Sequence, residues 1–177
     1  MLLAVTLASA QGVVNVAGFA NSLEEIRGEC TQIASKLSGE ASNAELKQRL
    51  DSDLRRMKSR QDVQVYAVGH GRQQTTNYQL EVMKADSEAD AAERQQISNQ
   101  RDEGLSVVNA CVEKALEKGK ALYSGVKRNK KMQEPATQLM TAWLVNTQSI
   151  SFYAPSGSQD SISDWKKAKA GAELSGL

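Results

Sequence analysis

The chain has 177 residues, a length that suits one domain able to bury a core without the help of a metal ion. Its 22 basic and 21 acidic residues give a net charge of +1, which argues against a dedicated nucleic-acid binder or an acidic solubilising protein. Two prolines in the whole chain permit long helices, because each proline inside a helix costs about 3 kcal/mol.

The first segment carries no charged side chain before Glu24. Residues 1–10 are mostly apolar and end in Ala8-Ser9-Ala10, the small-residue pattern of a signal-peptidase site. Only the terminal amine supplies positive charge ahead of this segment, so its resemblance to an export signal is incomplete.

Two other interpretations of the N-terminus stay open. Residues 1–20 could form a retained helix that inserts into a membrane, although Gln11 and Asn15 weaken it, or an ordinary buried first helix. We expect residues 1–20 to be a signal peptide or an apolar N-terminal segment, and residues 21–177 to form a single helical domain.

Helical periodicity begins at residue 22. Ser22 and Glu25 have the spacing of a capping box, and apolar residues then recur every three or four positions until Ser38-Gly39 ends the pattern. The pattern therefore predicts a first helix over 22–38.

A second capping box, Ser42 with Glu45, starts the next helix. Its apolar stripe contains Leu46, Leu50, Leu54 and Met57 on a heavily charged helix. Residues 62–68 alternate as a short strand would, but we favour a helix that continues to about Val68. Gly69-His70-Gly71 is expected to break the helix.

The longest helical pattern covers about 75–132. A heptad seam contains Tyr78, Val82, Ala85, Ala89, Ala92 and Gln96. A bulkier stripe resumes after Gly104. An unbroken helix would exceed the width of a compact domain, so either the helix breaks and folds back near 100–104 or the molecule is rod-like.

The last part of the chain predicts two shorter helices. Pro135 suits the first turn of one, residues 154–158 form a loop, and a final helix covers about 161–173. No internal repeat at a fixed period is evident. The predicted fold is an all-α, elongated bundle of four to five amphipathic helices, with one long helix or helical hairpin over about 75–132.

Two cysteines, Cys30 and Cys111, fit an exported chain in which they pair. Their bridge would close a loop of about 82 residues, for which chain entropy predicts about 4.5 kcal/mol of stabilisation. The alternative is two buried free thiols, because each lies in an apolar helical stripe. No cysteine spacing suits zinc.

Catalytic patterns are nearly absent. The single histidine, His70, lies between two glycines and is interpreted as a solvated turn residue, although a general base or metal ligand would also use a loop histidine. Cys111 as a nucleophile with His70 as its base is disfavoured by its apolar neighbours. No phosphate-binding loop occurs, so no catalytic residue, metal site or cofactor is predicted.

Basic residues gather near the end of the long helical pattern, without an acidic residue from 118 to 133: Lys118, Lys120, Lys127, Arg128, Lys130 and Lys131. They could meet an anionic partner, or they could be charges that favour a helix C-terminus. An acidic stretch over 81–93 is their counterpart in charge, which suggests antiparallel packing within the chain or between subunits.

These patterns predict an exported, non-enzymatic helical protein that acts by binding or assembly, outside the cytoplasm. Its expected partner is a protein or another copy of itself. The alternatives are a membrane-active or envelope-associated assembly subunit that uses the apolar N-terminus, and a carrier of small apolar ligands with room beside the alanines of 85–92.

Overall fold

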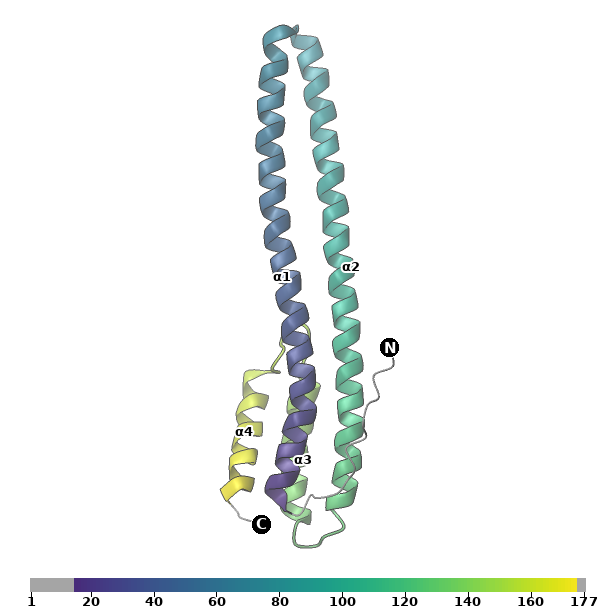
Figure 1. Ribbon diagram of the computed structural model, residues 1–177, viewed down its shortest axis with the longest axis vertical. Helices are drawn as coiled ribbons and strands as arrows, with labels where there is room; N and C mark the ends of the chain where they lie inside the picture. Colours follow the sequence, from purple (N-terminus) through teal and green to yellow (C-terminus); the bar gives the residue numbers. More distant parts are fainter. Residues whose placement is uncertain (1–14, 175–177) are drawn as a thin grey trace, which may run out of the picture. The chain divides into compact units, whose positions relative to one another are not determined.

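The structure, a computed structural model, describes residues 15–174. These residues form four helices and no strand (Figure 1): α1 (Val16–Gly69), α2 (Arg72–Val126), α3 (Gln133–Gln148) and α4 (Gln159–Leu174). The predicted all-α class and the predicted number of helices are confirmed.

Helix α1 is one continuous element of 54 residues, so the break predicted at Ser38-Gly39 is wrong. The two predicted capping serines lie inside the helix, where the Ser22 hydroxyl donates to the Gly18 carbonyl at 3.0 Å and the Ser42 hydroxyl to the Ser38 carbonyl at 2.9 Å. Such bonds satisfy a serine without ending a helix, and one interior glycine costs only about 1 kcal/mol.

Helix α2 likewise runs through Gly104 without a break, so of the two alternatives predicted over about 75–132 the single long helix is the one observed. The turn predicted at Gly69-His70-Gly71 is confirmed, because α1 ends at Gly69 and α2 begins at Arg72. Pro135 lies in the first turn of α3, and Pro155 lies in the loop before α4, as predicted.

The described chain divides into two compact units. Unit 1 contains residues 15–36 and 105–174, and unit 2 contains residues 37–104. Both units contain part of α1 and part of α2, so the single helical domain predicted over 21–177 stays a prediction.

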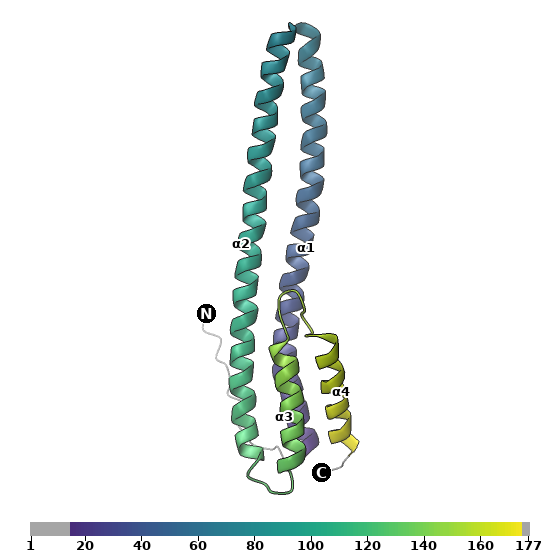
Figure 2. The ribbon, with the colours of Figure 1, turned by 180° about the vertical axis from the view of Figure 1, so that it is seen from behind.

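The core of unit 1 is apolar and centres on Trp143, which is fully buried. Its indole Nε1 donates to the Leu23 carbonyl at 2.8 Å, which joins α3 to α1. Figure 2 shows α3 and α4 side by side, and Trp165 of α4 donates to the Glu24 carboxylate. Trp143, Trp165 and Phe152 are buried, whereas Tyr153 is exposed.

The start of α1 belongs to this core. Val16 and Phe19 are fully buried, so the last residues of the predicted apolar segment 1–20 are part of a folded helix. Residues 1–14, which hold the predicted signal, lie outside the described residues. Within residues 15–174, no helix combines the length and hydropathy needed to cross a bilayer.

Candidate functional site

The interior of unit 2 is polar rather than apolar. Asp90 of α2 is 6% exposed and accepts hydrogen bonds from three α1 side chains. The donors are Ser52 at 3.0 Å, Arg55 at 2.8 Å and Arg56 at 2.9 Å. Arg55 also makes two bonds to Glu93, at 2.9 and 3.0 Å, so one guanidinium joins two carboxylates of the facing helix.

These bonds change the acidity of the groups that make them. Hydrogen bonds from Arg55, Arg56 and Ser52 lower the pKa of Asp90 from 3.8 to about 2, and the bond from Arg55 lowers the pKa of Glu93. The same contacts raise the pKa of Arg55 above its ordinary value. All three groups are therefore charged at neutral pH, and the two helices of unit 2 are joined by an ion-pair network.

Two further contacts lie on either side of this network. Towards residue 37, Arg101 of α2 forms an ion pair with Glu45 of α1. At the turn, the Tyr66 ring stacks on His70 at 3.8 Å and on Tyr78 at 4.4 Å between centroids. The His70 ring bonds the Tyr66 carbonyl at 2.8 Å, which agrees with its interpretation as a turn residue.

The opposite face of α1 in unit 2 is apolar and exposed. Leu50 is 60% exposed and Val68 is 91% exposed, although both are large hydrophobic residues. We call this surface the α1 stripe and define it by its six exposed side chains: Leu46, Leu50, Leu54, Met57, Val65 and Val68.

The polar interior and the α1 stripe lie on opposite sides of the same helix. Leu50 and Leu54 are each two residues from Ser52, which places them about 200° around the helix from the side chain that contacts α2. A simple amphipathic pattern would assign these apolar residues to the contact between α1 and α2. In the structure they face away from α2. Exposed apolar surfaces of this kind are often interaction sites in proteins, so the α1 stripe is a candidate site.

The seam predicted on α2 is only partly correct. Tyr78, Val82 and Ala89 are half-buried, but Ala85, Ala92 and Gln96 are exposed. The other residues on the inward face of α2 are the acidic residues of the network and Ile97. This face turns inward because its acids form ion pairs with Arg55 and Arg56.

A groove of about 530 Å³ lies in unit 2, between α1 and α2. Its lining mixes the apolar side chains Val63, Val82 and Met83 with charged ones, among them Arg60 and Arg94. The carrier hypothesis expects an apolar interior near residues 85–92, so this mixed lining suits it poorly. Binding of an apolar ligand stays a prediction.

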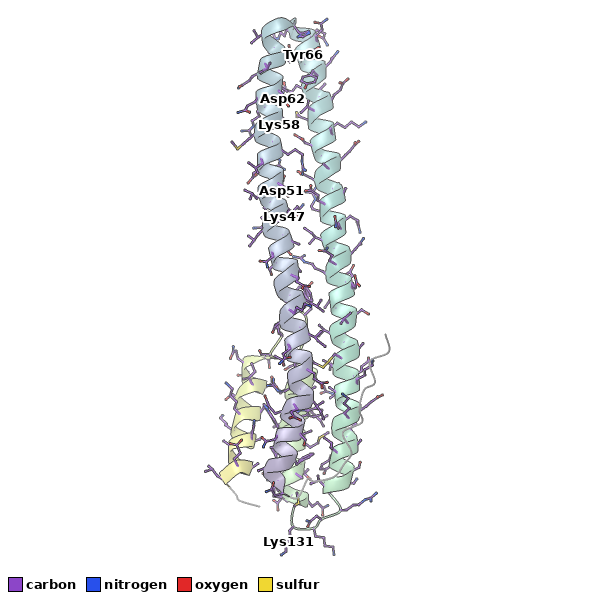
Figure 3. All side chains as sticks on the ribbon, viewed as in Figure 1. Lys47, Asp51, Lys58, Asp62, Tyr66 and Lys131 are labelled. Atoms are coloured by element: carbon purple, nitrogen blue, oxygen red, sulfur yellow. A yellow bond between two sulfur atoms is a disulfide. The ribbon has the colours of Figure 1, made fainter. Side chains whose placement is uncertain are left out.

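The predicted basic patch is divided between a helix and a loop. Lys127, Arg128, Lys130 and Lys131 are exposed in the loop that follows α2, from which Lys131 extends (Figure 3). Lys118 and Lys120 are exposed on α2 itself and point about 200° apart around the helix.

The contacts of these basic residues are local. Lys118 Nζ lies 3.4 Å from the Glu29 carboxylate, and Lys127 lies 5.9 Å from the centre of the Tyr123 ring. Within the acidic stretch over 81–93, Asp90 and Glu93 pair with Arg55 and Arg56 of α1 rather than with this patch. An anionic partner for the loop residues stays a prediction.

The disulfide between Cys30 and Cys111 is present in unit 1, where it joins α1 to α2. The two Cα atoms are 5.6 Å apart, within the usual range for a bridge. A bonded Cys111 has no thiolate, so it does not act as a nucleophile with His70 in this state. Residues 15–174 contain no group of three or more His, Cys, Asp or Glu side chains placed to hold a metal ion.

Comparison with known proteins adds no relative, because no family model, curated protein or solved structure matches this chain.

Proposed function

We propose that this is an exported, non-enzymatic protein that acts by binding or assembly, and that the α1 stripe of unit 2 is its binding surface. The observation that carries the proposal is the position of the stripe. Its six large apolar side chains are more than half exposed on a helix whose inward face is held by ion pairs.

The chain has an apolar core of its own, so the exposed stripe is not explained by a lack of apolar interior. Unit 1 buries Trp143, Phe19 and Leu23 completely. Large apolar side chains left in water on the other unit therefore favour a surface that a partner covers.

Export is proposed on two supports. One is the Cys30–Cys111 bridge, since disulfides persist in oxidising compartments. The other is the small-residue pattern at Ala8-Ser9-Ala10. A mature chain that starts at Gln11 would support this proposal, whereas a chain that retains Met1 would contradict a cleaved signal.

The binding surface can be tested in the cells that produce the protein. A photoreactive amino acid replaces Leu50 in the stripe or, as a matched control, Glu88, an exposed residue on α2. We expect illumination to cross-link position 50, but not position 88, to a protein. If position 50 captures no protein, the stripe is not a binding surface and the proposal fails.

A further inference from the structure

The α1 stripe has an internal period that is visible once its exposed residues are known. Leu46, Met57 and Val68 are separated by eleven residues, and so are Leu54 and Val65. Leu50 is followed eleven residues later by Gln61, which is also exposed. Eleven residues correspond to three helical turns of about 3.67 residues, so the stripe runs nearly straight along the helix. Such a repeat is typical of a helix that packs against another helix.

The flanks of the stripe follow the same period and carry alternating charge. On one flank, Lys47 and Asp51 are repeated eleven residues later as Lys58 and Asp62, which Figure 3 shows in succession along α1. All four side chains are exposed, and none has a hydrogen bond or ion pair within residues 15–174. The sign of the charge along this flank is therefore plus, minus, plus, minus.

A row of charges with this order is complementary to its own reverse. If a second, identical row runs in the opposite direction, every positive charge meets a negative one. A two-fold axis perpendicular to the helix produces this arrangement, because it reverses the second helix and brings each flank against the same flank of the other copy. The complementary partner with this charge order is thus another copy of the chain.

We propose that the partner that covers the α1 stripe is a second copy of this protein, packed antiparallel about such an axis. This inference rests on the proposed function, and it names the partner. In the matching register, Leu46 faces Val65 of the partner subunit and Leu54 faces Met57 of the partner subunit. Leu50 then faces Gln61 of the partner subunit, and a polar side chain at one core position helps to select a register.

The flanking charges agree with this register. In an antiparallel pair of helices, a flanking residue lies opposite a partner residue about two positions away from the partner residue that it would face if it were part of the core. Lys47 then lies opposite Asp62 of the partner subunit, and Asp51 lies opposite Lys58 of the partner subunit.

The other flank fits the same register. Asp53 lies opposite Arg60 of the partner subunit, and Asp53 and Arg60 are both exposed. Each pair occurs twice by symmetry. Parallel packing would bring unlike flanks together and match fewer charges, chiefly Asp53 with Lys58 of the partner subunit.

Charge exchange on one flank tests the proposal in the full chain. Asp51→Lys with Asp62→Lys makes the flank wholly positive, and Lys47→Asp with Lys58→Asp makes it wholly negative. All four positions are exposed, so each variant should keep the fold and the helical circular dichroism of the wild type. The matched control is Glu81→Lys with Asp102→Lys, two exposed acids of α2 away from the stripe.

Sedimentation equilibrium of the purified proteins gives the result. We expect the wild type and the control to dimerise, and each flank variant to dimerise about 50-fold more weakly at low salt, because attractive pairs become repulsive. An equimolar mixture of the two flank variants should recover the wild-type affinity as a heterodimer. At about 100 µM, even a weakly associating protein forms dimer. A wild type that stays monomeric at this concentration overturns the proposal. Variants that dimerise like the wild type also overturn it.

Zero-length cross-linking distinguishes the orientation. Lys47 and Asp62 are separated by about 22 Å along one helix, so a carbodiimide bond between them joins two copies. We expect this bond between isotopically labelled and unlabelled chains. A bond between Asp53 and Lys58 of different chains in its place would mean parallel packing and contradict the antiparallel register.

The proposed function and this inference can fail separately. If position 50 cross-links to a different protein while the purified chain stays monomeric, the stripe is a binding surface but its partner is not a second copy. If position 50 cross-links to nothing, both proposals are wrong.

Discussion

Gly119 lies where α2 packs closely against the Trp143 ring. A Cβ atom at this position would lie 2.3 Å from the indole carbon Cη2, far inside van der Waals contact. The ring cannot turn away without loss, because it is fully buried and its Nε1 bonds the Leu23 carbonyl. Glycine is needed here for close approach rather than for an unusual backbone angle.

We therefore expect Gly119→Ala to lower the free energy of unfolding of unit 1 by about 1–2 kcal/mol. Overpacking costs about 1–3 kcal/mol, and the higher helix propensity of alanine offsets about 1 kcal/mol of it. Denaturant unfolding followed by tryptophan fluorescence measures the effect, since both tryptophans lie in unit 1.

Gly28→Ala is the matched control for this substitution. Gly28 lies in the part of α1 that belongs to unit 1, and a Cβ atom there would meet nothing within 4 Å. It should stabilise the unit by up to about 1 kcal/mol. If both alanine variants are more stable than the wild type, the contact between Gly119 and Trp143 does not limit the packing.

At the scale of the element, the helices of unit 2 depend on the charge of Asp90. Its pKa of about 2 is below the usual value, so the charged form favours the folded state. This contribution is complete above about pH 4 and is lost as the pH falls through about 2. Glu93 has a lowered pKa for the same reason and adds to the trend.

We expect the thermal midpoint of unfolding, measured by circular dichroism, to fall as the pH is lowered from 5 to 2. Asp90→Asn should lower the midpoint at pH 7 and flatten its pH dependence, because the network then lacks its central carboxylate. Asp102→Asn, at an exposed carboxylate of α2 away from the α1 stripe and with no partner within residues 15–174, is the control and should leave both unchanged. An equal pH dependence in the wild type and Asp90→Asn would contradict this account.

The sequence predicted where helices form better than it predicted which faces meet. Periodicity identified the turn at Gly69-His70-Gly71, the start of α3 near Pro135 and the helical class, because these follow from local preferences. It failed at Ser38-Gly39 and left open whether the helix breaks at Gly104, because glycine and serine weaken a helix only modestly and packing decides whether it continues.

The orientation of the helices in unit 2 could not be predicted in the same way. An apolar stripe is ordinarily assigned to the nearest helix of the same chain. Here Arg55 and Asp90 occupy that contact, and residues 46–68 present the stripe to solvent. The pairing depends on side chains 35 residues apart, which no local pattern of the sequence contains. The bridge between Cys30 and Cys111 was predictable because only one pairing of two cysteines exists.

At the scale of the whole molecule, two long helices pass through units with unlike interiors. Unit 1 has an apolar core and a disulfide, whereas unit 2 is held mainly by charged and polar pairs. Apolar burial contributes far more to stability than partly exposed ion pairs, which contribute a few tenths of a kcal/mol to about 1 kcal/mol each. One helix should therefore be unevenly stable along its length.

Hydrogen exchange of the backbone amides, measured segment by segment, tests whether the two long helices are less stable in unit 2 than in unit 1. In dilute protein at pH 7, we expect amides in 44–68 to exchange at least about tenfold faster than amides in 20–36, although both segments belong to α1. The same contrast should separate 74–100 from 108–124 in α2. Uniform protection along α1 would mean that the helix opens as one cooperative unit and that the two interiors do not differ in stability.

Protein concentration then separates local stability from association. If a second copy covers the α1 stripe, protection of 44–68 should rise with protein concentration while protection of 20–36 stays constant, because association stabilises only the segment it buries. The variant Asp51→Lys with Asp62→Lys should abolish that rise without changing exchange in unit 1. A concentration-dependent rise that persists in this variant would place the contact between copies somewhere other than the stripe.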